Sequence, residues 1–307
     1  MTESFILGIV LSESMSAFGE ECMRFVSYEN AGIRGLAVAT EGDGYRGLLA
    51  SDSGFPGTLD EIVRRNDFAA AAQALRSGAP LDLDAVTFRT PLANPGKVLC
   101  VGLNYSDHAA ESAMEVPPFP TVFARFPSGF VAHGAPLVRP RVSEMFDYEG
   151  EVVAVIGKSG REIPEAEALD HVCGYSIFND GSIRDFQLQT PQWTVGKNFD
   201  GTGAFGPIFV TADELPPGAA GLRIETRLND QVLQRANTDD LIFDIRKLVS
   251  LLSIGMTLEA GDIIVTGTPS GVGMARSPKV FMKPGDVCEV SVERIGTLRN
   301  PVVAQEA

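Results

Sequence analysis

Three carboxylates are the residues of this chain best suited to chemistry. Glu149 and Glu151 stand two apart at the start of the apolar, β-branched run 151–156, and Asp180 ends the tripeptide 178–180. Two like charges held close together repel strongly, and a bound divalent cation removes that cost. Ligands that are all oxygens suit magnesium, manganese or calcium better than zinc. The spacing alone is also typical of an ordinary half-exposed strand with polar residues facing water.

The run 151–156 must be extended if these side chains are to act together. Side chains at positions i and i+2 of a strand share one face, so Glu149 and Glu151 are expected to point the same way. The same face continues with Val153 and Val155, which are poor residues to leave in water. We therefore expect the glutamates to begin an inward or cleft-facing row.

A second group lies in segment 102–111, after the strand-like run 97–101. It is typical of a strand, a turn and a helix start, with Ser106 or Asp107 as the cap. His108 and Glu111 are then three apart on one helix face, where a carboxylate can orient an imidazole as a general base. The alternative is a helical histidine beside a glutamate by chance.

The chain resembles the fumarylacetoacetate hydrolase family from about residue 97 to residue 303. The segments that carry the resemblance are 102–111, 147–157, 179–187, 192–197 and 266–273. The resemblance implies metal ligation by Glu149, Glu151 and Asp180. It also implies that His108 and Glu111 form a water-activating dyad and that Lys197 is a catalytic group that stabilises charge. Three further side chains are implied to line the substrate: Arg184, Gln187 and Thr268.

The resemblance also implies a fold and an assembly. The expected class is mixed α+β and mainly β, with a catalytic domain whose strands roll into a distorted β-barrel and a smaller N-terminal α/β domain. Members of the family bind magnesium or manganese, with calcium possible in crystals, and usually pair as homodimers.

The chemistry implied is that of 2-oxo acids and 1,3-diketones, which chelate a metal through two oxygens and yield an enolate. Because His108 and Glu111 are both present, we predict hydrolysis of a carbon–carbon bond in a 2,4-diketo acid of acylpyruvate or fumarylpyruvate type. The alternative is an isomerase, tautomerase or decarboxylase of a 2-oxo dicarboxylic acid, of hydroxyheptadienedioate or oxaloacetate type. A metal-stabilised binding protein without activity is a third possibility, which the intact residue set disfavours.

Two features bear on the substrate. Arg125 stands where lysine is more usual in the family. Because its planar guanidinium can donate two parallel hydrogen bonds to a carboxylate, we hypothesise that it binds a terminal carboxylate of the substrate. The glycine-rich stretch 267–273 lacks the lysine of a phosphate loop, which argues against nucleotide binding. Its backbone amides and the Thr268 hydroxyl could instead approach a bound carboxylate, and a plain turn is the alternative.

Composition agrees with an enzyme acting on small molecules. The 307 residues are 44% hydrophobic and carry a formal net charge of -15, which disfavours nucleic acid and anionic membranes as partners. An anionic substrate must then be received by local positive charge, from the metal, Arg184 and Lys197. The four cysteines form no Cys-x-x-Cys pair, so we expect reduced thiols in the cytoplasm rather than zinc or disulfides.

The chain divides into three expected parts. Residues 1–22 are expected to be an upstream extension, with Met23 as a candidate natural start. Residues 23–90 are expected to form the small domain, with strands at 36–38 and 45–49 and helices at 59–64 and 68–76. Residues 91–307 are expected to form the catalytic domain, with a core-packing helix at 244–252.

Overall fold

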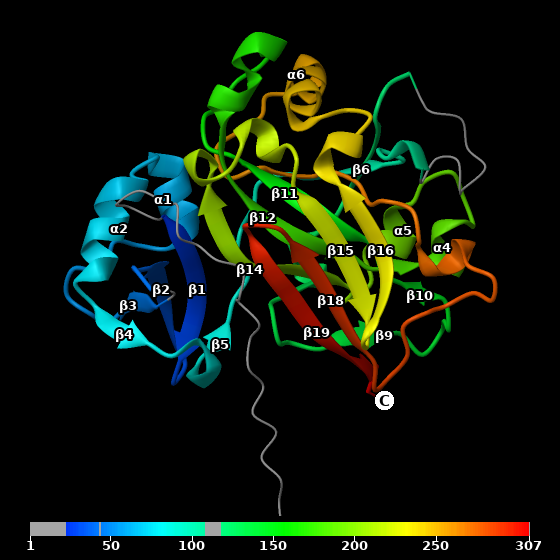
Figure 1. Cartoon of the computed structure of the whole chain (residues 1–307), viewed down its shortest axis with the longest axis horizontal. Coiled ribbons are helices and arrows are strands. Elements are labelled where there is room, and N and C mark those ends of the chain that lie inside the picture. Colours follow the sequence, from blue (N-terminus) through cyan, green and yellow to red (C-terminus); the bar gives the residue numbers. More distant parts are fainter. Residues whose placement is uncertain (1–22, 43, 108–117, 307) are drawn as a thin grey trace, which may run out of the picture.

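The computed structural model describes residues 23–42, 44–107 and 118–306 and is mainly β (Figure 1). The predicted dyad, His108 and Glu111, and the predicted upstream extension lie outside the described residues. Within the described part, each helix is too short or too polar to span a bilayer. Its three cysteines, Cys100, Cys173 and Cys288, form no disulfide with one another.

The N-terminal region is an antiparallel group of strands with two helices beside it, at the left of Figure 1. Its elements are β1 (Arg24–Asn30), β2 (Ile33–Ala39), β3 (Tyr45–Leu49), α1 (Leu59–Arg65), α2 (Phe68–Arg76), β4 (Ala79–Leu81) and β5 (Thr87–Phe88). A capping box between Thr58 and Glu61 starts α1, and Asn66 in the left-handed region ends it. The predicted strands and both predicted helices are therefore confirmed.

The central feature is an open twelve-stranded sheet. Its remaining strands are β6 (Val98–Gly102), β7 (Thr121–Ala124), β8 (Phe130–Val131), β11 (Gly150–Ile156), β12 (Val172–Asp180), β14 (Gly203–Thr211) and β17 (Ile263–Val265). The main path runs β4-β3-β2-β1-β14-β12-β11-β17-β6-β7. The expected class, mixed α+β and mainly β, is confirmed. Among the described strands of the expected catalytic domain, β14 and β7 end the path and do not pair with each other, so these strands close no barrel.

A second, five-stranded sheet packs over β11 and β12. It contains β9 (Leu137–Arg139), β15 (Arg223–Leu228), β16 (Gln231–Asn237), β18 (Val287–Val292) and β19 (Gly296–Ala304), in the order β16-β15-β18-β19-β9. The remaining strands and α-helices of the described residues are the short pair β10 (Phe146–Asp147) and β13 (Ser182–Ile183) and the helices α4 (Arg184–Gln187), α5 (Thr194–Lys197) and α6 (Ile245–Gly255). The last confirms the helix predicted at 244–252.

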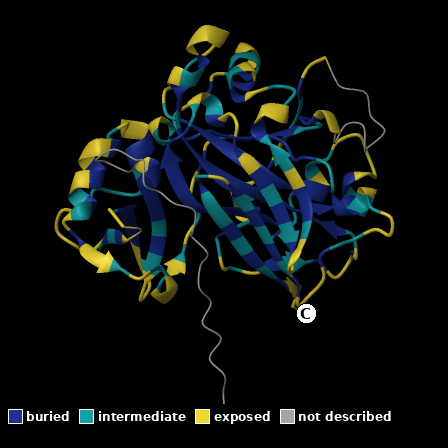
Figure 2. Ribbon diagram, in the orientation of Figure 1, coloured by how far each residue is buried: buried dark blue, intermediate teal, exposed yellow. Residues whose placement is uncertain are grey.

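Strand β11 is buried on both faces (Figure 2). Val152, Ala154 and Ile156 belong to the larger hydrophobic cluster, which includes residues of the second sheet. Val153 and Val155 belong to a second cluster, which also contains the apolar faces of α1 and α2. Burying each such branched side chain contributes roughly 1.5–3 kcal/mol, so the strand is firmly held. The predicted inward row therefore exists.

The two expected domains share one sheet. Strand β1 pairs antiparallel with β14, with Arg24 opposite Val210 and Phe25 opposite Phe209. Residues 91–96, at the start of the expected catalytic domain, contain no helix or strand. The domain division near residue 90 remains a proposal, and the shared sheet means that the N-terminal region supports the strands that carry the candidate site.

Candidate metal centre

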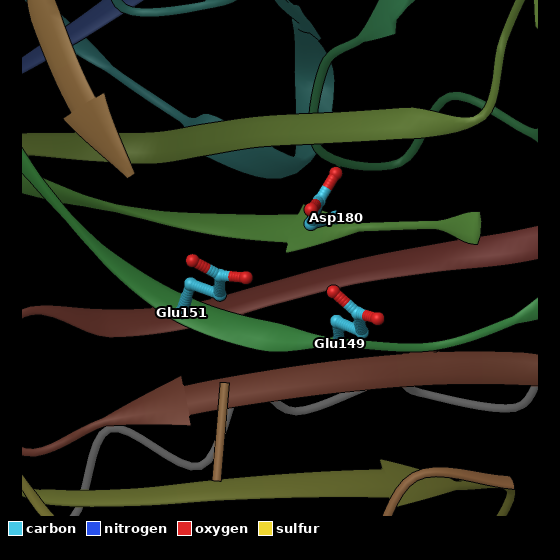
Figure 3. A group of neighbouring side chains, drawn as sticks. All are labelled: Glu149, Glu151 and Asp180. Atoms are coloured by element: carbon cyan, nitrogen blue, oxygen red, sulfur yellow. The ribbon is translucent and has the colours of Figure 1, made fainter. Parts of the chain in front are cut away.

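Glu149, Glu151 and Asp180 come together at one end of the β11–β12 hairpin (Figure 3). In the register, Gly150 lies opposite Asn179, and the backbone amide of Asp180 donates to the carbonyl of Glu149 across 2.8 Å. One oxygen from each carboxylate lies within 4.8 Å of the others, and all three residues are buried. The structure thus brings together the three predicted ligands, although they come from two strands.

Electrostatics of the cluster favour a cation. Burial raises the pKa of Glu151 well above its usual value, and the neighbouring Asp180 and Glu149 raise it further. Lys197 and the backbone amide of Gly267 act in the opposite direction on this pKa. A donor set made only of buried carboxylate oxygens fits a hard divalent cation such as magnesium or manganese.

Lys197, at the end of α5, lies between two of the carboxylates. Its Nζ donates to Oε2 of Glu149 at 2.7 Å and to Oδ2 of Asp180 at 2.6 Å, and it lies 4.9 Å from the centre of the Phe123 ring. Burial lowers the pKa of Lys197, but the two carboxylates outweigh burial and raise it overall. The side chain is therefore a fixed positive charge beside the candidate metal position.

Arg184 begins α4 on the other side of Glu149. It donates to Glu149 Oε1 at 2.6 Å, to Asp147 Oδ2 at 2.8 Å and to Gln187 Oε1 at 2.8 Å. Its Nη2 is buried and has no hydrogen-bond partner among the described residues. A buried donor without a partner is costly, so this atom is suited to an anionic ligand.

Asp147 ties this arginine to the glycine-rich loop. Its Oδ1 accepts from the amide of Gly273 at 2.7 Å and its Oδ2 accepts from the amide of Met274 at 2.9 Å. A Cβ at Gly273 would lie 2.7 Å from Asp147 Oδ1, so only glycine fits the close approach. The loop is therefore anchored to the site rather than being a plain turn.

Residues 97–303 match the family model described as Fumarylacetoacetate (FAA) hydrolase C-terminal. The chain belongs to the fumarylacetoacetate hydrolase family. It is 41% identical to "Oxaloacetate tautomerase YisK" of Bacillus subtilis, over 80% of this chain and 87% of that one. It is 36% identical to the mitochondrial "Oxaloacetate tautomerase Fahd2a" of Rattus norvegicus, over 92% of each chain.

Solved structures of fumarylacetoacetate hydrolase family proteins agree with the fold. A fumarylacetoacetate hydrolase from psychrophilic Exiguobacterium antarcticum matches with a TM-score of 0.80 and 35% identity, over 92% of this chain and 100% of that chain. A maleylpyruvate hydrolase from Sphingobium sp. SYK-6, in complex with manganese (II) ion and pyruvate, matches with a TM-score of 0.76 and 26% identity over the same shares. Metal binding by this chain is thus supported by its acidic cluster and by a family neighbour.

Thr268 supports strand β11, which carries Glu151. Its hydroxyl donates to the carbonyl of Gly150 at 3.0 Å, and it accepts from Gln234 Nε2 at 2.9 Å. Gln234 Oε1 in turn accepts from the amide of Gly150 at 3.1 Å. Sequence reasoning did not find Gln234, because a lone glutamine on β16 carries no local signal that it contacts β11.

Arg125 has a different partner from the one the sequence suggested. Its side chain is fully buried, and Nη1 donates to Oδ1 of Asp180 at 2.5 Å. The carboxylate it holds therefore belongs to a predicted metal ligand rather than to a substrate. The hypothesis of a substrate grip rested on the residue type alone, which does not indicate how deeply the side chain is buried.

Proposed function

We propose that this protein is a metal-dependent tautomerase of a 2-oxo dicarboxylic acid, of the oxaloacetate type. The observation that carries the proposal is the buried cluster of Glu149, Glu151 and Asp180, with the Lys197 ammonium and Arg184 Nη2, buried and unpartnered among the described residues, beside it. Support also comes from the relatives named as oxaloacetate tautomerases, which cover most of the chain. This reading replaces hydrolysis as the preferred function.

The proposed reaction moves one proton and one electron pair. A proton leaves C3 of the keto form, the C–H electrons form the C2–C3 double bond, and the C2 oxygen takes up a proton. Glu149, Glu151 and Asp180 would hold a divalent cation, which would supply Lewis acidity to the reaction. The fixed charge of Lys197 stabilises the negative charge that develops on oxygen, and Arg184 Nη2 binds a substrate carboxylate.

Lys197 is better placed for electrostatic stabilisation than for proton abstraction, because its ammonium donates to both Glu149 and Asp180. The proton acceptor is therefore expected to be another group. His108, oriented by Glu111, remains the prediction for that role. The charged groups are held in place before a substrate binds, because Arg184 and Lys197 form ion pairs with the carboxylates.

Hydrolysis of a 2,4-diketo acid is the second candidate. The presence of His108 and Glu111 in the sequence and the likeness to a maleylpyruvate hydrolase favour it. In that reaction His108 would take a proton from an attacking water, and Lys197 would stabilise the same developing charge. The two candidate reactions therefore use the same charge-stabilising groups, but only hydrolysis requires an attacking water.

The deciding experiment compares oxaloacetate with acetylpyruvate and fumarylpyruvate. The protein is supplied with Mn²⁺, loss of the enol is followed by ultraviolet absorbance, and products are identified by mass. Faster enol–keto exchange of oxaloacetate without fragmentation, lost in Glu149→Gln, supports the tautomerase. Pyruvate plus an acid from a diketo acid, lost in His108→Ala, would replace it with the hydrolase. Metal without protein is the control, because free divalent cations also promote reactions of oxaloacetate.

The assembly of the protein and its location in the cell are further parts of the proposal. We propose that the protein is a homodimer in the cytoplasm, as expected from the family resemblance and from the free cysteines. Light scattering during size-exclusion chromatography measures the mass of the protein in solution and so tests the dimer. A monomeric mass at the concentration of the activity assay would contradict it.

A further inference from the structure

Each of the three proposed ligands has one carboxylate oxygen held from outside the cluster. Glu149 Oε1 accepts from Arg184, Glu151 Oε2 accepts from the amide of Gly267 at 2.5 Å, and Asp180 Oδ1 accepts from Arg125. The other oxygens of Glu149 and Asp180 both face Lys197. One oxygen of each carboxylate is therefore held by an outside partner, and one oxygen of each lies within 4.8 Å of the others.

The pocket around Arg125 is built for a guanidinium. Besides Asp180, its Nη1 donates to the carbonyl of Gly181 at 3.0 Å, and Nη2 donates to Thr202 Oγ1 at 3.0 Å. The guanidinium carbon lies 5.5 Å from the centre of the Phe178 ring, a distance at which a cation and an aromatic face attract. A Cβ at Gly203 would lie 2.7 Å from Nη2, so glycine leaves the space that the fork occupies.

These contacts fix the orientation of Asp180. The carboxylate cannot turn its Oδ1 inward without breaking the bond to Arg125 and leaving a buried charge without its partner. A lysine in this position has one nitrogen and cannot serve Asp180 and Thr202 through separate, rigidly spaced groups. The presence of arginine therefore has a structural consequence at the metal position.

We propose that Arg125 is a positioning residue that keeps Asp180 a one-oxygen ligand and so makes the centre select small octahedral cations over calcium. Magnesium demands near-octahedral geometry at short distances, whereas calcium takes more ligands and often both oxygens of a carboxylate. Three carboxylates limited to one oxygen each offer calcium too few protein ligands. The inference rests on the metal centre of the proposed function, but it concerns binding and not turnover.

The test measures metal affinity without substrate. Mn²⁺ binding is followed by electron paramagnetic resonance, and Ca²⁺ is titrated as a competitor, in the wild type, Arg125→Met, Arg125→Lys and Thr202→Val. Loss of an outer partner typically costs about 10–100-fold in metal affinity. We expect Arg125→Met to lower Mn²⁺ affinity within that range and to lower the preference for Mn²⁺ over Ca²⁺ about tenfold, with smaller changes in the same direction for the other two variants.

Thr238→Val is the matched control for Thr202→Val. Thr238 is also a buried threonine, but its hydroxyl donates to the carbonyl of Ala219 and accepts from the amide of Leu222, outside the cluster. Its Mn²⁺ to Ca²⁺ preference should equal that of the wild type. If Arg125→Met does not fold, as judged by circular dichroism, Arg125→Lys and Thr202→Val carry the test.

An unchanged preference in the folded Arg125 variants and in Thr202→Val would overturn the inference. A wild type that binds no Mn²⁺ would overturn the metal centre itself and the inference with it. Neither result depends on which substrate is correct. A wild type that binds Mn²⁺ selectively but shows no tautomerase activity would contradict the proposed function and leave the role of Arg125 supported.

Discussion

Glu149 and Glu225 have almost the same local geometry in two different environments. Glu149 binds Arg184 at 2.6 Å with one oxygen and Lys197 at 2.7 Å with the other. Glu225 binds Arg227 and Arg235, each at 2.7 Å, also with one oxygen apiece. The side chains of Lys197 and Arg184 are 2% and 7% exposed, whereas that of Arg235 is 63% exposed.

The distance between two charges therefore does not by itself determine what an ion pair contributes. On the surface, water solvates any charge that loses its partner, so each pair contributes little to stability. In the site, a charge without its partner stays buried, and the members of the cluster depend on one another. This dependence holds the carboxylates in place for a cation, and it predicts a graded response to mutation.

Lys197→Met should have the largest effect. It leaves Glu149 and Asp180 buried beside each other without the ammonium between them. Breaking a buried pair in this way costs about 3–5 kcal/mol of unfolding free energy. Urea unfolding without metal measures this loss, and Mn²⁺ should raise the melting temperature more in the variant than in the wild type, because the cation replaces the missing charge.

Lys247→Met is the control for that variant, since Lys247 is an exposed lysine on α6. It should unfold like the wild type. A Lys197→Met protein as stable as this control, with the same response to Mn²⁺, would mean that the cluster is not interdependent.

Gln234→Leu tests the neutral part of the same site and should have the second largest effect. The change removes the partners of the Gly150 amide and the Pro269 carbonyl, both in the buried contact between the two sheets. Each buried group left unpaired costs about 1–3 kcal/mol, so we expect a loss of about 2–4 kcal/mol in urea unfolding. Gln231→Leu, at an exposed position of the same strand, should change stability by less than about 0.5 kcal/mol.

The sequence predicted those parts of the site that depend on local periodicity. Alternation along 151–156 correctly indicated an inward-facing strand, and the run 68–76 correctly indicated a helix, because both patterns follow from the geometry of a single element. Asp180 was singled out with the two glutamates as a candidate oxygen ligand, but no local pattern predicts that it lies beside Glu149.

The parts that the sequence did not predict depend on contacts between distant elements. Arg125 and Asp180 are 55 residues apart, and Gln234 and Gly150 are 84 residues apart. Which side chains meet at such separations is decided by sheet order and by how the second sheet packs. The same limit applies to closure of the catalytic-domain strands, because whether β14 and β7 meet depends on the twist of all the strands between them.

Lys97→Met should give an intermediate effect. Lys97 Nζ binds the buried Asp262 at 2.9 Å and the exposed Glu259 at 2.8 Å. In the variant, Asp262 still accepts hydrogen bonds from the backbone amides of Lys97 and Glu259, so its charge remains partly compensated. We therefore expect the unfolding free energy to fall by about 1 kcal/mol.

The effect of Lys97→Met should also depend on pH. Although burial lowers the pKa of Lys97, the two carboxylates raise it above its usual 10.5 overall. Its contribution is therefore fully present below pH 10.5 and is lost as the pH rises through the raised value. The stability difference between wild type and variant should be constant near pH 8 and shrink at strongly alkaline pH. A difference that stays constant at high pH would contradict the ion pair as its source.

Arg235→Ala should have the smallest effect of these substitutions on the unfolding free energy. Glu225 keeps Arg227, and water replaces the lost guanidinium, so the unfolding free energy should fall by no more than about 0.5 kcal/mol. The two arginines lower the pKa of Glu225 although its partial burial opposes them. A lowered carboxyl pKa stabilises the fold above the usual value of 4.5 and ceases to do so as the pH falls, so even this small difference should vanish in acid or high salt. A loss of several kcal/mol here would show that the second sheet depends on its surface charges as the site depends on its buried ones, and the contrast between Glu149 and Glu225 would not hold.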